Sequence, residues 1–164
     1  MIPTIKRVLY ATDLSENAKF AFAYAADLAQ RYDAKLTILS VLETLSPYTE
    51  GLIQEMMGLD DWNRLKSEHQ ENSKEKIKQR ITDFCQEMDT KIESCNFIAD
   101  DIQVTKGIPH REILRVAKEV CADMIVMGTY GHNILQDSLI GGTTRRIVKD
   151  STIPVLVIRL PEDD

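Results

Sequence analysis

The stretch Met127-Gly128-Thr129-Tyr130-Gly131, followed after nine residues by Gly141-Gly142-Thr143-Thr144, decides how this chain folds. An apolar run, residues 124–127, leads into the first glycine, and a segment with helical spacing, residues 144–149, follows the last pair. This order predicts a strand, a glycine loop and the start of a helix. Glycine is favoured where the backbone passes close to a ligand or takes a positive φ, and free amides at a helix N-terminus bind anions. The loop therefore predicts a phosphate site, unless the glycines only shape a turn and cap the helix.

Length and charge exclude several classes of protein. The chain has 164 residues and a formal net charge of −6, which suits a single domain over residues 1–164. An acidic balance leaves no basic face for a nucleic-acid backbone or an anionic membrane surface, and the sequence has no apolar span of about 20 residues. We therefore expect neither nucleic acid nor a membrane as a partner.

The three cysteines indicate a reducing compartment. Cys85, Cys95 and Cys121 are odd in number and have no CxxC spacing, so neither a disulfide framework nor a zinc site is indicated. The first nine residues lack the apolar core and cleavage site of a leader. We expect a cytoplasmic protein with no metal site of its own.

The residues before the glycine loop predict two strands and a helix. Residues 7–11 are a short apolar run that ends at Thr12-Asp13, and residues 35–42 have the nearly continuous apolar character of a strand covered on both faces. Ser15 is a suitable N-cap for a helix that continues to Arg31. The apolar residues of that helix recur at helical spacing: Ala18, Ala21, Phe22, Ala25, Ala26 and Ala29.

Regular patterning weakens between residues 43 and 63. The segment is interrupted by Pro47, Gly51 and Gly58, and we predict a partly ordered excursion. Met56, Met57 and Trp62 could form a surface for a partner, although flexible core filling beneath a long loop is the simpler interpretation. A long polar helix is predicted over residues 65–92. Its apolar stripe consists of Ile77, Ile81, Phe84, Cys85, Met88 and Ile92.

The last third of the chain continues the alternation of strands and helices. Residues 101–106 predict a strand, and Pro109 stands in the first turn of the helix after it, where its missing N–H does no harm. Residues 124–127 and 154–158 predict two more strands, the last beginning with Pro154 as an edge strand permits. His110, at the helix entry, has no positioned partner that would support a catalytic role.

The resulting order βαβαβαβαβ predicts a five-stranded parallel sheet with helices on both faces. Such sheets bind ligands beyond the carboxyl ends of their strands, where the winding reverses. Asp13, Val41 and the glycine loop all lie at that end. A carboxylate suits a ribose hydroxyl, a valine suits an adenine face, and the loop suits phosphates. Asp13 could instead belong to the cap region of the helix that follows it, and Val41 could be core, but their joint placement favours a nucleotide.

These residues resemble the universal stress protein family. Its pattern of Gly, two residues, Gly, nine residues, Gly is met by Gly128, Gly131 and Gly141, and the similarity extends through residues 10–15 and 153–158. The resemblance implies a three-layer, Rossmann-like fold of the adenine nucleotide alpha hydrolase-like type. It also implies a stress-response or signalling module that binds ATP, ADP or AMP, with or without Mg²⁺, and dimerises through its last strand.

The resemblance implies a role for each matching residue. Asp13 would hold the ribose, Val41 would meet the adenine through its backbone, and Thr144 could add a hydroxyl. Backbone amides would bind phosphates at Gly128, Gly131, His132, Gly141, Gly142 and Thr143. The neighbouring Ala11, Thr12 and Met127 complete the implied site.

Three departures from the family pattern concern the phosphates. Gly142 stands where the family usually has Ser or Thr, so a hydroxyl is missing unless Thr143 or Thr144 replaces it. His132 stands where a basic residue is frequent, and Tyr130 stands where His is common. Charge neutralisation is weaker, though Arg145 could compensate in part. The preference among ATP, ADP and AMP stays open.

An enzyme is the main competing class of function. The sequence has no SGGxDS or HIGH signature, no P-loop ending in Gly-Lys-Ser/Thr, and no nucleophile–base spacing. We therefore favour a nucleotide-binding protein, with slow ATP hydrolysis as one alternative. A dimeric interaction protein that has lost nucleotide binding is the other, because of Gly142.

The last strand predicts a homodimer. Residues Val155, Leu156, Val157 and Ile158 form a continuous apolar run at the end of a parallel sheet. An edge strand there exposes a row of N–H and C=O groups that a stable monomer must cover, shorten or charge. A partner strand related by a two-fold axis offers the simplest closure.

Overall fold

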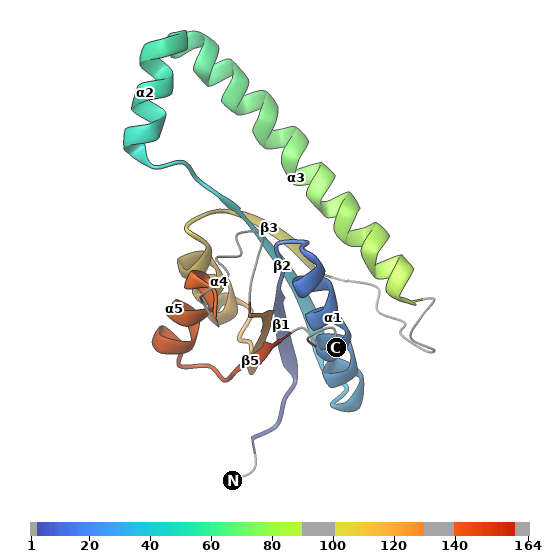
Figure 1. Ribbon diagram of the computed structural model, residues 1–164. Helices are drawn as coiled ribbons and strands as arrows, with labels where there is room; N and C mark the ends of the chain where they lie inside the picture. The colour runs from blue at the N-terminus through green and yellow to red at the C-terminus, as the bar shows by residue number, and fades with distance from the viewer. Residues whose placement is uncertain (1–2, 90–100, 130–139, 160–164) are drawn as a thin grey trace, which may run out of the picture.

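The structure is a computed structural model that describes residues 3–89, 101–129 and 140–159. Its elements in chain order are β1 (Arg7–Ala11), α1 (Glu16–Arg31), β2 (Lys35–Glu43), α2 (Pro47–Met57), α3 (Leu59–Asp89), β3 (Ile102–Gly107), α4 (Pro109–Glu119), β4 (Met124–Gly128), α5 (Gly142–Asp150) and β5 (Val155–Ile158). The strands of the described part form one parallel, five-stranded sheet in the order β3-β2-β1-β4-β5. This confirms the predicted parallel sheet (Figure 1).

The winding of the sheet reverses between β1 and β4. β1 pairs with β2 on one side and with β4 on the other. The chain therefore runs outward through β2 to β3, then crosses to β4 and runs outward to β5. The switch point lies at the carboxyl ends of β1 and β4, where ligands bind in sheets of this kind.

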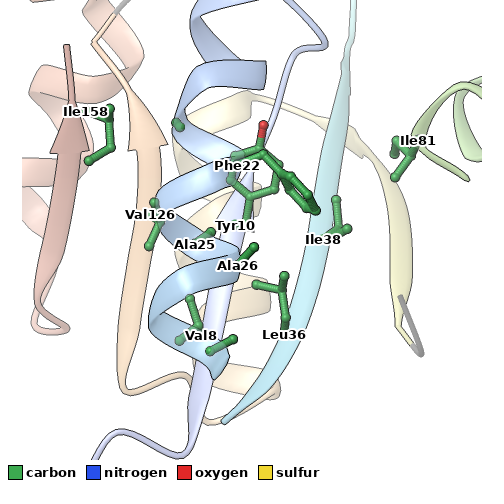
Figure 2. Close-up of a cluster of buried hydrophobic side chains, with 12 residues drawn as sticks. Val8, Tyr10, Phe22, Ala25, Ala26, Leu36, Ile38, Ile81, Val126 and Ile158 are labelled. Atoms are coloured by element: carbon green, nitrogen blue, oxygen red, sulfur yellow. The ribbon is translucent and has the colours of Figure 1, made fainter. Parts of the chain in front are cut away.

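Helices cover both faces of the sheet, as predicted. α1 packs on one face, and α4 and α5 pack on the other (Figure 1). Because side chains alternate along a strand, Val8 and Tyr10 face α1, where they meet Phe22 and its neighbouring alanines (Figure 2). Leu9, between them, faces the core under α4 and α5. The alanines of α1 that face the sheet are buried, which lets this helix approach the sheet closely: Ala18, Ala21, Ala25, Ala26 and Ala29.

The predicted partly ordered excursion over residues 43–63 is wrong, because residues 47–57 and 59–63 are helical. The Ser46 side chain accepts a hydrogen bond from the Thr49 N–H at 3.2 Å and caps α2. Pro47 occupies the first turn, where it is tolerated. Gly58 ends α2 with a φ of 86°, a conformation that favours glycine. Pro47 and Gly58, which suggested irregular structure, therefore mark the boundaries of a helix.

α3 begins at Leu59, earlier than the predicted residue 65. The pair α2 and α3 extends beyond the sheet, and α3 returns beside β3 (Figure 1). Ile81 is fully buried and, with Ile77, joins the core on the α1 side of the sheet. The side chains of the other predicted stripe residues lie outside the described part: Phe84, Cys85, Met88 and Ile92.

The core-filling interpretation of the Met and Trp residues holds for Trp62 but not for Met56. Trp62 is 7% exposed, which fits core filling, whereas Met56 is 87% exposed and fills no core. Lys66 connects the two helices, because its Nζ lies 2.9 Å from the Glu50 carboxylate and 5.7 Å from the centre of the Trp62 ring. The α2–α3 pair is therefore held by its own contacts.

β5 is an edge strand of the sheet. Pro154 precedes the strand instead of starting it, and its C=O accepts from the Ile125 N–H at 2.9 Å. Across the described ranges, no helix combines the length and the apolar character that crossing a membrane requires.

Candidate functional site

A cavity of about 420 Å³ opens at the carboxyl ends of β1, β2 and β4. Ten of the predicted site residues line it: Ala11, Thr12, Asp13, Val41, Met127, Gly128, Gly141, Gly142, Thr143 and Thr144. The remaining two, Gly131 and His132, lie outside the described residues. Residues from opposite ends of the chain thus meet at the switch point of the sheet.

Asp13 lies in the turn between β1 and α1. Its Oδ1 accepts from the Ser15 N–H at 3.0 Å, and the Thr12 hydroxyl accepts from the Leu14 N–H at 3.0 Å. The helix cap itself is Ser15, which accepts from the Ala18 N–H at 3.2 Å. Asp13 therefore lies in the cap region of α1, although the capping side chain is that of Ser15. The bonds of Thr12 and Asp13 to the backbone two residues on are of the ST and Asx types, and they hold the exposed Asp13 carboxylate at the cavity.

Val41 belongs to a part of β2 that extends past the end of β1. The pairing with β1 stops at Ala11 and Leu39, whereas β2 continues along β3 to Glu43. We call residues 40–43 the β2 overhang. Its side chains still alternate between the two faces of the sheet, and Val41 packs against the core under α4 and α5.

The hydrogen-bond pattern shows which way the backbone of the overhang points. The Leu39 C=O accepts from the Thr12 N–H at 2.9 Å, on the β1 side, while the Ile38 N–H donates to the Asp101 C=O at 3.0 Å, on the β3 side. Backbone groups point to the same edge at every second residue of a strand. The N–H and C=O of Val41 therefore point to the β1 side, beyond the end of β1 and into the cavity.

The first turn of α5 supplies amides to the opposite wall of the cavity. The Arg145 N–H donates to the Gly141 C=O at 2.9 Å, which closes the first turn. The N–H groups of Gly142, Thr143 and Thr144 precede that bond, so the helix itself offers them no acceptor. The Gly141 N–H is different, because it donates to the Thr129 C=O at 2.8 Å. Two of these, Gly142 and Thr143, are predicted phosphate amides, and the Thr144 amide joins them, whereas the Gly141 amide is used by the fold.

Gly141 and Gly142 begin that turn, and Gly142 leaves space beside it. Gly141 caps α5 with a φ of −63°, and Gly142 also lies outside the left-handed region. A Cβ added at Gly142 would meet no described atom within 4 Å. Neither residue is required by the backbone conformation, so the absence of side chains mainly lets a ligand come close to the amides.

The two threonines of the turn differ in their surroundings. Thr144 is 3% exposed, and its hydroxyl donates to the Gly128 C=O at 3.1 Å, which joins α5 to the end of β4. Thr143 is half-buried and also lines the cavity. Thr143 is therefore the better placed of the two to replace the missing hydroxyl at Gly142.

The charge of the lining is acidic. Asp13 and Glu43 are its carboxylates, and the described lining contains no Lys or Arg. Arg145 is exposed and lies outside the lining, so the predicted compensation by this residue is not seen. Within the described ranges, no three His, Cys, Asp or Glu side chains gather as metal ligands.

Among the described lining residues, five were not predicted: Ala18, Leu39, Glu43, Pro109 and Ile113. Leu39 and Ile113 follow the sequence pattern of core residues, so their position in the cavity lining could not be predicted from the sequence. Glu43 had a usable signal, because side chains two apart on a strand share a face. The prediction of Val41 as a site residue could therefore have been extended to Glu43. It was not, because residue 43 was assigned to the excursion and not to the strand.

Comparison with known proteins gives a consistent result. The Universal stress protein family model matches residues 4–159. Universal stress protein MJ0577 of Methanocaldococcus jannaschii is 28% identical over 154 residues, which cover 94% of this chain and 94% of that protein. The solved structure of MJ0577 has a TM-score of 0.70 at 26% identity and covers 98% of this chain and 100% of its own.

Two further solved structures have the same fold. UspA from Lactobacillus plantarum gives a TM-score of 0.66 at 25% identity, over 96% of this chain and 100% of that one. A universal stress protein in complex with cAMP gives a TM-score of 0.60 at 18% identity, over 95% and 98%; this likeness shows the fold alone. The Rossmann-like α/β fold expected from the sequence is confirmed.

Proposed function

The chain belongs to the universal stress protein family, and from that premise we propose that it binds an adenine nucleotide, ATP, ADP or AMP, as a stress-response or signalling module. The observation that carries the proposal is the convergence of three kinds of group on one cavity of about 420 Å³. These are the Asp13 carboxylate, the open backbone of Val41 and the amides of the α5 turn. The volume lies in the range of small-molecule sites.

Each part of an adenine nucleotide has a matching group in the cavity. The Val41 N–H and C=O suit the donor and acceptor pair on the edge of adenine, and the apolar Leu39 and Ile113 suit its faces. The Asp13 carboxylate suits a ribose hydroxyl, because an ionised carboxylate accepts hydrogen bonds. The amides of Gly142 and Thr143, at the positive end of α5, suit a phosphate.

The acidic lining bears on which nucleotide is preferred. Two carboxylates and no described cation oppose a long anionic tail. AMP carries the least phosphate charge of the three nucleotides. ATP would need Mg²⁺ to reduce its charge, and we expect its affinity to fall more than that of AMP when Mg²⁺ is removed with a chelator.

The proposal is tested by titration calorimetry with ATP, ADP and AMP. Replacing Asp13 by Ala should weaken the binding of all three nucleotides about tenfold, because each would lose a hydrogen bond to a charged group. Asp60→Ala is the matched control, because Asp60 is exposed on α3, away from the cavity, and should leave binding unchanged. No heat from the natural chain at millimolar nucleotide would contradict the proposal.

Two alternatives are separated by simple measurements. Native mass spectrometry of freshly purified protein would show retained nucleotide as a mass increment, which an interaction protein without nucleotide binding would lack. Released phosphate, measured after incubation with ATP, tests slow hydrolysis. Binding without phosphate release supports the binding module.

We also propose that the protein is a homodimer formed through β5. The proposal is supported by the position of β5 at the edge of the sheet and by its apolar sequence. An uncovered strand edge is a template for pairing with another chain. A second copy with the same edge would cover both.

A further inference from the structure

Glu43 is the last residue of β2 and the lining residue furthest along the β2 overhang. Its position is held by β3, because Glu43 pairs with Gly107 and the Thr44 N–H donates to the Gly107 C=O at 3.3 Å. Side chains two apart share a face of a strand, so the Glu43 side chain follows that of Val41 along the cavity. Its carboxylate is exposed and is not required by the core.

The direction of β2 determines how a purine would lie against Val41. Along a strand, the C=O of a residue lies further toward the C-terminus than its own N–H. In a purine whose acceptor nitrogen N1 lies beside a 6-amino group, N1 therefore accepts from the Val41 N–H, and the amino group donates to the Val41 C=O. The amine then lies on the side of Glu43, which is about 7 Å further along the strand.

An exocyclic amine has two protons, and the Val41 C=O uses one of them. Building on the proposed nucleotide site, we infer that Glu43 accepts the second proton and selects purines that carry a 6-amino group. A carboxylate only accepts hydrogen bonds, so a purine without the amine offers it no donor at this position. A 6-oxo purine places an oxygen against it with no proton between them. Glu43 is thus a specificity-determining residue.

The alternative is that Glu43 is only a charge at the rim of the cavity. A rim charge repels the phosphate of any nucleotide, so its removal would strengthen all nucleotides by the same factor. A bond to the amine changes affinity only for ligands that have the amine. The ratio of affinities for two nucleotides that differ in this group separates the two cases, because the phosphate effect cancels.

The test uses AMP and purine riboside 5′-monophosphate, which has the same ribose and phosphate but no 6-amino group. Titration calorimetry measures both ligands on the natural chain, Glu43→Ala, Glu43→Gln and Glu55→Ala. We expect the preference for AMP to fall about fivefold in Glu43→Ala. Glu43→Gln should lose less, because its amide oxygen still accepts. Glu55 is exposed on α2 and outside the lining, so Glu55→Ala should keep the full preference.

Each outcome has a distinct meaning. If the natural chain binds AMP and the preference is the same in Glu43→Ala, the role of Glu43 is overturned while the nucleotide site stands. If Glu43→Ala binds both ligands more tightly by the same factor, the role of Glu43 is also overturned, and Glu43 is identified as a rim charge. If the natural chain binds neither ligand, the proposed function itself fails, and the role of Glu43 with it. Thermal unfolding of each variant verifies that it is folded.

Discussion

At the scale of single residues, the glycines of this chain meet different physical needs. Gly58 and Gly107 have φ of +86° and +152°, where an L side chain is strained. Gly141 and Gly142 have no such requirement, and the missing side chain of Gly142 keeps the backbone of the cavity open. Only the second pair is expected to affect ligand binding directly.

Gly142→Ser should strengthen the binding of ATP relative to that of AMP by about 1 kcal/mol, the net contribution of one added hydrogen bond. The serine should fit, because the site has open space and no left-handed φ. Calorimetric titration with both nucleotides measures the difference. Equal gains for ATP and AMP would mean that position 142 does not address the distal phosphates.

Gly107→Ala should destabilise the fold by roughly 1–3 kcal/mol, the usual cost of a strained backbone conformation. The added Cβ would also lie 2.9 Å from the Glu112 Cγ, and Glu112 is held by Arg115 at 2.7 Å. Urea unfolding measures the loss. Gly51→Ala is the control, since it meets no described atom within 4 Å and should stabilise α2 by about 0.5–1 kcal/mol. Equal effects of the two changes would contradict this account.

The pKa of Glu112 is lowered, first by its hydrogen bond from Arg115 and further by the charge of that residue. A carboxylate with a lowered folded-state pKa stabilises the fold above its unfolded value of 4.5. That contribution is lost as the pH falls through the folded-state pKa. Glu112→Gln should therefore reduce the loss of stability between neutral pH and pH values below 4.5. Urea unfolding across this range measures it, and an unchanged pH dependence would count against the ion pair.

At the scale of elements, α2 shows how a helix can form without a core-facing stripe. None of its residues is buried, so its hydrophobic pattern carries little signal. It is stabilised by the Ser46 cap and by the contact of Glu50 with Lys66 on α3. Such a helix should open more readily than those that cover the sheet.

Ser46→Ala should destabilise α2 by about 1 kcal/mol, the typical cost of losing an N-cap. Hydrogen exchange of the α2 amides should become faster, while β1 and β4 should exchange as before. Ser67→Ala, which removes an exposed serine within α3, is the matched control and should not accelerate α2. Protection of α2 that is the same in both variants would show that the cap is unimportant.

At the scale of the whole molecule, the carboxyl ends of the strands and the outer edge of the sheet have separate expected functions. The carboxyl ends carry the cavity, while the outer edge of β5 is the proposed dimer surface. The cavity lining includes no residue of β5. Dimerisation and nucleotide binding are therefore testable independently.

Val157→Lys should convert a dimer into a monomer, because a charge would be buried at the centre of the β5 contact. Light scattering coupled to size exclusion measures the mass at micromolar concentration. Val148→Lys, at an exposed position on α5, makes the same chemical change away from β5 and should stay dimeric. A natural chain that is already monomeric, or a Val157→Lys chain that remains a dimer, would rule out this interface.

By itself, the sequence determined the alternation of strands and helices, and therefore that Asp13, Val41 and the glycine loop lie at the carboxyl end of a parallel sheet. Those signals are local: apolar runs of strand length, the Ser15 cap and the glycines after β4. Only the tertiary structure decided that β2 extends past β1, that the Thr144 hydroxyl and the Gly141 amide are used by the fold, and that Glu43 lines the cavity. These features depend on the register between strands and on contacts between distant segments, which no local pattern contains.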